Sequence, residues 1–238
     1  MSAVSFPVPS GDLSRAQVRE FRVPAIPVTV LTYRRPRYLA MTLDSFALQH
    51  AAILSSFSFR ALVHGGRHWP TEKILEQRAS LIPSVEVIDD NPGGGVGFSR
   101  LMAAVIQEEA PYVLHLEDDW LSAESLEPYM GEILDFMAAH REVGQIRLRD
   151  VRSPVSKVNP FTKKEIVWQP ATEHIKVGNA HFTFNPAITR ASILPQIVPC
   201  KSEREACIKY TRLNLLCGQL QAGCFGHIGA EKAGRMAE

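Results

Sequence analysis

Short apolar segments alternate with amphipathic ones over the first 150 residues of the chain. Apolar positions recur at helical spacing in four places: after Pro36, over residues 71–78, over 98–107 and over 123–140. Five runs have the length and apolar content of buried strands: Ile26–Thr32, Phe57–His64, Ser84–Ile88, 112–116 and 145–148. Strands and helices that alternate in short units predict a mostly parallel sheet flanked by helices.

The pattern becomes less regular after Asp150, where prolines separate short runs. Residues 165–168 and 180–184 have a strand-like composition, and a last helix is predicted over 203–216 with Ser202 as its N-cap. We therefore expect a single domain with an N-terminal arm (1–24), a first half (25–150) and a second half (151–238).

Composition and charge narrow the class of protein. The 238 residues are 45% hydrophobic and 21% charged, with a formal net charge of +1. Such a chain can bury a core, and its near-neutral charge gives no reason to expect nucleic acid as a partner. No apolar run reaches the ~18 residues of a membrane span, and no signal-peptide pattern is present, so we expect a cytoplasmic protein. Among the four cysteines no Cys-x-x-Cys pair suggests zinc, and Cys207 and Cys217 are expected to be buried thiols.

The most informative segment is Glu117-Asp118-Asp119, where an apolar run ends in three consecutive carboxylates. Adjacent carboxylates repel one another, and a divalent metal neutralises them best. The carboxyl edge of a parallel sheet is also where α/β proteins bind ligands. The segment therefore predicts a metal and diphosphate site, with a solvated acidic turn as the alternative.

A glycine cluster, residues 93–97, stands between a predicted strand and a predicted helix. Glycines at such a position allow the backbone to approach a phosphate group at the helix N-terminus. The cluster is not a P-loop, because no Gly-Lys-Ser/Thr follows, and it is not a dinucleotide fingerprint, because Arg100 replaces the third glycine. A flexible turn is the alternative.

Three further groups are candidates for chemistry. Arg34 and Arg35 follow the first strand and could bind phosphate or stack on a base, or could form a solvated basic turn. His227 gains a role only where a metal needs a ligand other than a carboxylate. Glu203 and Glu205 open the last helix, which suits the helix dipole, and a general base would require one of them to face a pocket.

Taken in order, these segments resemble the nucleotide-sugar glycosyltransferases of the GT-A fold, particularly the inverting family 2. The resemblance covers about residues 26–229 and rests on the stretches VTVLTYRRPRYLAMTLDSF, DDNPGGGVGFSR, LEDDW, HFTFNPAITR and CFGHIG. It implies a GT-A-type, Rossmann-like α/β fold. The mostly parallel sheet of the first half (25–150) would bind the donor, and a smaller mixed second half (151–238) would bind the acceptor.

The resemblance also implies roles for individual residues. The nucleotide sugar would contact Thr32, Tyr33, Arg34, Asp89, Asp90, Gly95, Gly97, Arg100, Glu117 and Asp118. A divalent metal, Mn²⁺ or Mg²⁺, would bind Asp119 and His227 and stabilise the leaving diphosphate. Glu205, or secondly Glu203, would be the general base. The implied reaction transfers a sugar from a nucleoside-diphosphate sugar to a hydroxyl of a glycan, lipid-linked or protein acceptor, with inversion.

Departures from the family pattern leave other functions open. The second strand ends in His64-Gly65-Gly66, where many members carry an Asp pair, and the last helix opens with Glu203-Arg204-Glu205 instead of Glu-Asp. A non-catalytic nucleotide- or sugar-binding module, or a degenerate transferase, is therefore the alternative. A nucleotidyltransferase is less favoured, because it would need a lysine-bearing glycine loop near the N-terminus.

Overall fold

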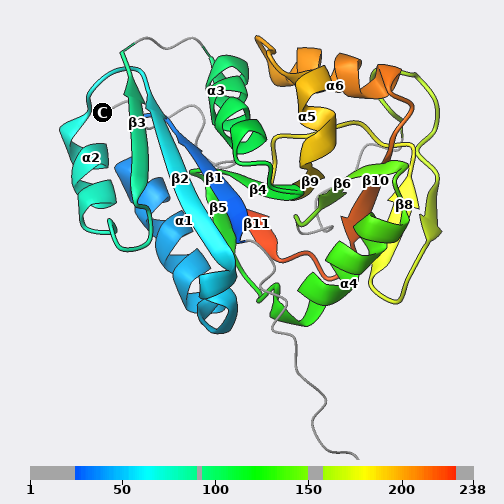
Figure 1. The fold of residues 1–238 in the computed structure, drawn as a ribbon, viewed down its shortest axis with the longest axis horizontal. Coiled ribbons are helices and arrows are strands. Elements are labelled where there is room, and N and C mark those ends of the chain that lie inside the picture. Colours follow the sequence, from blue (N-terminus) through cyan, green and yellow to red (C-terminus); the bar gives the residue numbers. More distant parts are fainter. Residues whose placement is uncertain (1–24, 90–92, 150–157, 229–238) are drawn as a thin grey trace, which may run out of the picture.

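The computed structural model describes residues 25–89, 93–149 and 158–228, which form a three-layer α/β/α structure (Figure 1). The predicted N-terminal arm lies outside these residues. The first half contains β1 (Ile26–Thr32), α1 (Pro36–Gln49), β2 (Phe57–His64), α2 (Trp69–Glu76), β3 (Ser84–Ile88), α3 (Gly94–Gln107), β4 (Tyr112–Glu117), β5 (Trp120–Ser122), α4 (Glu127–Ala139) and β6 (Val143–Arg147). The second half contains β7 (Trp168–Pro170), β8 (Ile175–Gly178), β9 (Ala187–Arg190), α5 (Leu194–Ile197), α6 (Glu203–Arg212), β10 (Leu216–Leu220) and β11 (Phe225–His227).

Nine of these strands form one mixed sheet in the order β3-β2-β1-β4-β9-β6-β10-β8-β7. The first four pair in parallel, as do β6 and β10, whereas β9 and β8 are antiparallel to both of their neighbours. Seven of the nine strands in this sheet therefore run in the same direction, which confirms the mostly parallel sheet. A separate pair, β5 and β11, lies beside the end of β4.

Helices cover both faces of the sheet, because the strands carry apolar side chains on both sides. In Figure 1, α3, α5 and α6 lie along the upper side of the sheet, and α1 and α4 lie along its lower side. In β1, Val28 and Val30 pack into the core under α1, while Leu31 packs into the core under α3. Strands buried on both faces read as continuous apolar runs, which is why β1 and β2 match their predicted bounds. The edge strand β3 also matches its predicted bounds, although Ile88 is its one buried residue.

The second half departs from the predictions. Residues 180–184 are not a strand, since the side-chain amide of Gln145 donates to the carbonyl of Thr183 at 2.9 Å and its oxygen accepts from the Thr183 N–H at 3.1 Å. Side-chain bonds thus replace a strand partner for this backbone. The helix predicted over 203–216 ends earlier, at Arg212. Asn214, two residues further on, has a left-handed φ of 53°, and the chain then continues as β10.

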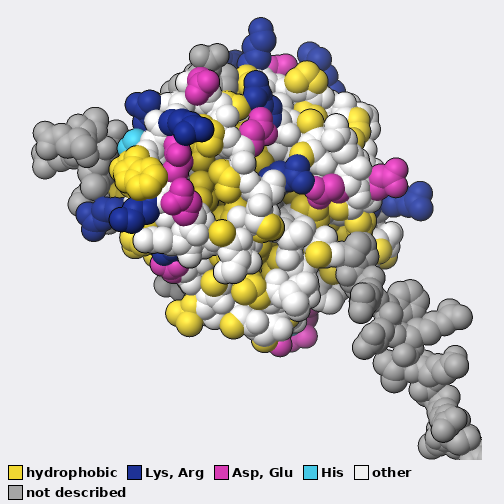
Figure 2. Space-filling view, turned by 60° about the vertical axis from the view of Figure 1, so that its left-hand side comes forward, with side chains coloured by type: hydrophobic (Ala, Val, Ile, Leu, Met, Phe, Trp, Pro, Cys, Tyr) yellow, Lys and Arg dark blue, Asp and Glu magenta, His cyan; other side chains and the backbone are white. Residues whose placement is uncertain are grey.

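Surface and interior agree with the composition. On the face shown in Figure 2, acidic and basic side chains are interspersed, so this face carries no continuous basic surface for nucleic acid. Cys207 and Cys217 are buried thiols, as predicted.

Over the described ranges, none of the helices has both the length and the apolar character that crossing a bilayer requires.

Candidate functional site

The turns that follow β1 and β4 meet at the carboxyl edge of the sheet, and Asp118 joins them. Its Oδ2 accepts hydrogen bonds from the Thr32 hydroxyl at 2.6 Å and from the backbone N–H of Tyr33 at 3.1 Å. Arg35 forms an ion pair with the other oxygen. Burial raises the pKa of Asp118 to about 6, while Arg35 and the two hydrogen bonds oppose that rise. Asp118 therefore holds the β1 turn against the acidic strand end.

Asp119 and His227, the two residues that the resemblance assigns to a metal, lie side by side. The pairing of β11 with β5 places His227 opposite Trp120, and its Nε2 lies 3.3 Å from Oδ2 of Asp119. The N–H of Ile228 donates to the Asp119 carbonyl at 3.0 Å, which fixes the C-terminal segment at this edge. Nη1 of Arg35 also donates to Oδ2 of Asp119, at 2.7 Å.

These residues fit a divalent cation that substrate oxygens help to hold. In the described part of the chain, no three His, Cys, Asp or Glu side chains are grouped so that they could bind a metal by themselves. The buried Oδ1 of Asp119, however, lacks a hydrogen-bond partner among the described residues, and the His227 imidazole lies next to the same carboxylate. A cation bound by these two residues, with diphosphate and water oxygens completing its shell, would satisfy that oxygen.

Glu117, the first of the three carboxylates, is held in its neutral form. Burial raises its pKa to about 8, and the charges of Asp119, Glu203 and Asp118 raise it further, while Arg35 acts in the opposite direction. At neutral pH a protonated carboxyl can donate a hydrogen bond to a ligand oxygen. The acidic strand end is therefore less negative than three consecutive carboxylates would suggest.

A second group of predicted residues gathers where β1, β2 and β3 end. Arg34 has a left-handed φ of 46°, and its guanidinium donates to the carbonyl of Gly65. Gly65 and Gly66 have φ of +91° and +79°, and a Cβ on Gly65 would overlap the ring of Tyr33. Glycine is therefore required at this turn. Asp89 is exposed, and its backbone lies beside Gly66.

Three other residues predicted to bind the donor have different contacts. Gly95 is buried, and a Cβ there would overlap the backbone of the segment that precedes α6. Gly97 packs against a leucine of β1, whose Cδ1 would lie 2.6 Å from an added Cβ. Arg100 is exposed and pairs with Glu86 at 3.1 Å. Packing thus accounts for both glycines, and Asp90 lies outside the described residues.

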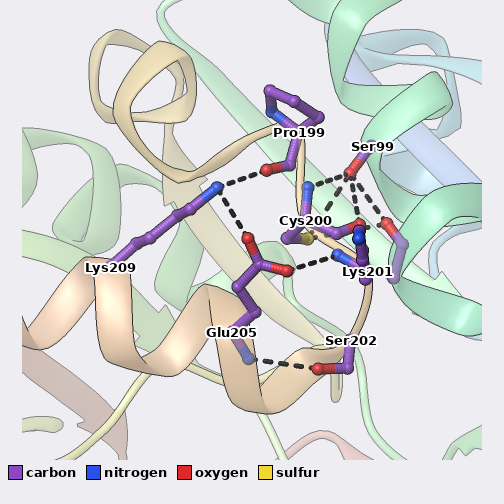
Figure 3. A network of polar contacts seen from close by, with 8 residues as sticks. Ser99, Pro199, Cys200, Lys201, Ser202, Glu205 and Lys209 are labelled. Atoms are coloured by element: carbon purple, nitrogen blue, oxygen red, sulfur yellow. Dashed lines mark hydrogen bonds and ion pairs between the residues drawn. The ribbon is translucent and has the colours of Figure 1, made fainter.

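Glu205 closes the N-terminus of α6 (Figure 3). Its Oε2 accepts from the N–H of Lys201 at 2.8 Å, and its Oε1 pairs with Lys209 at 3.1 Å. Its own N–H donates to the hydroxyl of Ser202 at 3.2 Å, which confirms Ser202 as the N-cap. The N–H of Lys201 and the ammonium of Lys209 lower the pKa of Glu205. Both oxygens therefore serve the helix end.

Glu203, two residues before Glu205, lines a cavity of about 500 Å³. Its Oε1 accepts from the Thr183 hydroxyl at 3.1 Å and from the N–H of Phe184 at 2.8 Å, which leaves Oε2 for a ligand. The cavity is also lined by Arg147, Arg149, His181 and Arg204. The charge of Glu203 is among the influences that raise the pKa of Glu117, so the cavity lies on the same side of the sheet edge as the acidic strand end.

No protein-family model matches the sequence, and no curated protein matches it significantly. Solved structures of S. aureus TarS are similar. The structure of TarS 1–349 has a TM-score of 0.53 and 17% identity and covers 84% of this chain and 59% of that one. A second TarS structure has a TM-score of 0.55 and 18% identity, covering 84% and 36% of the two chains. The complex of TarS 1–349 with UDP-GlcNAc has a TM-score of 0.55 and 17% identity and covers 84% of this chain and 57% of that one.

The fold is GT-A-like, as in TarS. This result confirms the fold class predicted from the sequence. At 17–18% identity the similarity establishes the fold alone. The present chain spans 36–59% of the length of the three TarS chains.

Sequence reasoning did not single out several residues of this GT-A-like site. Arg147 and Arg149 stand at the end of β6, and His181 and Thr183 lie in the segment misread as a strand. The arginines could have been noticed, because two basic residues stand at the carboxyl end of a predicted parallel strand. Nothing in the local pattern marks His181 or Thr183.

Proposed function

We propose that this chain transfers a sugar from a nucleoside-diphosphate sugar to a hydroxyl group of an acceptor. The observation that carries the proposal is the carboxyl edge of β1 and β4, where Asp118 and Asp119 meet the turn of residues 32–35 in a GT-A-like fold. Ligands of open α/β sheets bind at this edge. TarS, which has a similar fold, has been solved with UDP-GlcNAc and with UDP.

In this proposal the nucleoside part of the donor lies over the ends of β1, β2 and β3. Tyr33 exposes 37% of its surface and offers a ring for stacking. The Arg34 guanidinium and the exposed Asp89 carboxylate supply polar contacts to the base and ribose. Thr32 acts indirectly, because its hydroxyl holds Asp118.

The diphosphate then extends towards Asp119 and His227, which would hold a divalent cation, Mn²⁺ or Mg²⁺. Such a cation would neutralise charge on the leaving diphosphate. Asp118 keeps Asp119 in place through the β1 turn, and Glu117 contacts the donor from the end of β4. Arg35 balances the two aspartates before the donor arrives.

Glu203 is the better candidate for the general base. Its free Oε2 faces the cavity, whereas both oxygens of Glu205 are engaged at the helix end. The base accepts the proton of the acceptor hydroxyl as that oxygen attacks the anomeric carbon on the face opposite the diphosphate, and this single displacement inverts the configuration. The acceptor is a glycan, a lipid-linked sugar or a protein hydroxyl.

A thermal-shift screen of UDP, GDP, CDP and dTDP, each with and without Mn²⁺, tests the donor site. One nucleoside diphosphate at about 100 times its Kd should stabilise the protein by about 2.7 kcal/mol, which corresponds to several degrees for a domain of this size. Asp119→Asn should abolish the part of the shift that depends on Mn²⁺. Asp44→Asn, at an exposed pair with Arg78, is the matched control and should keep it.

Two results would contradict the proposal. A folded protein that shows no shift with any nucleoside diphosphate would remove the donor site. Binding without transfer to any glycan, lipid-linked or protein acceptor would instead support the non-catalytic binding module or degenerate transferase.

A further inference from the structure

The cavity beside Glu203 has an unusual charge. Of the described residues that line it, Arg147, Arg149 and Arg204 are basic, and Glu203 is the acidic one. His181 does not add to the positive charge, because burial and the two neighbouring arginines lower its pKa to about 4. Two arginines next to each other repel, and one carboxylate cannot balance three guanidiniums.

Three buried nitrogen atoms in this cavity lack hydrogen-bond partners within the described residues. They are Nε of Arg147, Nε of Arg149 and Nδ1 of His181. Arg147 is 1% exposed, and its Nη2 donates to the carbonyl of His181. Buried polar groups are nearly always satisfied in folded proteins, so three unpaired nitrogens around one cavity indicate a missing ligand.

The position of the cavity indicates whether the missing ligand is part of the donor or part of the acceptor. The cavity is built from the end of β6, the start of α6 and residues 181–185, whereas the donor nucleoside is proposed to lie over β1, β2 and β3. The acidic end of β4 and strand β9 separate the two regions in the sheet order. Glu203, the proposed general base, lines this cavity, so the cavity lies on the acceptor side of the reacting centre.

We propose that this cavity binds an anionic group of the acceptor, a phosphate or a carboxylate that lies close to the hydroxyl to be glycosylated. Guanidinium groups form paired hydrogen bonds with both kinds of oxyanion. Arg147 and Arg149 bind the anion, and Arg204, at the exposed rim on α6, adds a third charge. This inference rests on the proposed transferase function and specifies its acceptor class.

Binding of small acids to the intact protein tests the inference. Saturation-transfer NMR titrations would compare glucuronate and glucose 6-phosphate with glucose, which carries no charge. We expect at least one of the two acids to bind about tenfold more tightly than glucose, and the tighter one shows whether a carboxylate or a phosphate is preferred. Arg149→Gln should weaken binding of that acid about fivefold or more, and Arg204→Gln should weaken it less because Arg204 is exposed.

Arg60→Gln provides the matched control, since Arg60 pairs with Glu108 on the surface away from the cavity. It should leave acid binding unchanged. Acids that bind no more tightly than glucose, or that bind equally well to Arg149→Gln, would overturn the inference. Arg149-dependent preference for UDP-glucuronate over UDP-glucose, with no preference for the free acids, would place the anion on the donor and would also overturn it.

The outcome is separable from the donor test. A nucleoside diphosphate that binds while neither acid does would refute the anionic acceptor and leave the transferase proposal standing. Acids that bind through Arg149 while no nucleoside diphosphate binds would support the anion site and remove the donor site.

Discussion

Two carboxylates on the first turn of α6 have very different surroundings. Glu205 is engaged with Lys201 and Lys209, whereas Glu203 turns towards the cavity and keeps one oxygen free. The resemblance to family 2 offered these two residues as candidate general bases and ranked Glu205 first. Their order could not be read from the sequence, because both acids suit a helix N-terminus and only the contacts of residues 183 and 184 separate them.

Substitution of each glutamate separates the two roles. Glu203→Gln keeps the size of the side chain but removes its basicity, so the transfer rate should fall about 10²- to 10⁴-fold with little change in Tm. Glu205→Gln should lower Tm, because it weakens the ion pair with Lys209, and should keep most of the activity. Rates measured with saturating donor and Tm from thermal unfolding distinguish them. A larger loss of rate in Glu205→Gln would return the base to Glu205.

Among elements, the start of α3 shows how packing can imitate a ligand motif. The glycine cluster suggested a phosphate loop, yet Gly95 is needed because the chain before α6 crosses directly over it. The same crossing lets the Ser99 hydroxyl accept a hydrogen bond from the N–H of Cys200 at 2.8 Å (Figure 3). A glycine-rich helix start therefore positions α6, and with it Glu203, against the sheet.

Neighbouring glycines provide the test. Gly95→Ala would force a Cβ into the backbone at Ser202 and should reduce the free energy of unfolding by about 1–3 kcal/mol. Gly94→Ala meets nothing within 4 Å and should leave stability unchanged or raise it by up to about 1 kcal/mol. Urea unfolding of both variants provides the measurement. Equal stability of the two would contradict the packing explanation. Loss of UDP binding by stably folded Gly95→Ala would favour the phosphate loop.

Stability of the whole molecule should depend on pH through buried groups whose pKa values differ between the folded and unfolded states. His50 is buried, and burial lowers its pKa from 6.5 to about 4. Between these values the unfolded chain binds more protons, so the free energy of unfolding falls as the pH drops. Asp118 acts in the opposite direction, because its raised pKa means that the folded state binds more protons. The measured dependence of stability on pH is the sum of such contributions, so a variant that removes one titrating group is needed to isolate that group.

His50→Gln isolates the histidine. Nδ1 of His50 accepts from the N–H of Leu126 at 3.1 Å, so Nε2 carries the proton and donates to Ser122 at 2.8 Å. Protonation would break the bond to Leu126. Urea unfolding at several pH values between about 4 and 6.5 should show a shallower acid loss in the variant, by up to about 1.4 kcal/mol per pH unit. Ser122→Ala should destabilise the protein but keep the steeper loss. Parallel profiles for wild type and His50→Gln would contradict the assignment.

Local sequence was sufficient to predict the strands in the first half of the sheet and the acidic residues at its edge. A strand buried on both faces must be apolar along its length, so β1 and β2 could be delimited from the chain. The carboxylates of 117–119 were recognised because charge at the end of an apolar run is costly without a partner.

Long-range packing was needed for the rest. The insertion of β9 between β4 and β6 and the contact of His227 with Asp119 join segments that lie far apart in the chain. The cavity around Arg147 and Arg149 also joins distant segments, because the end of β6 and the start of α6 both line it. Strands of three to five residues leave a weak periodic signal, and side-chain periodicity reports which face is buried but not what it is buried against.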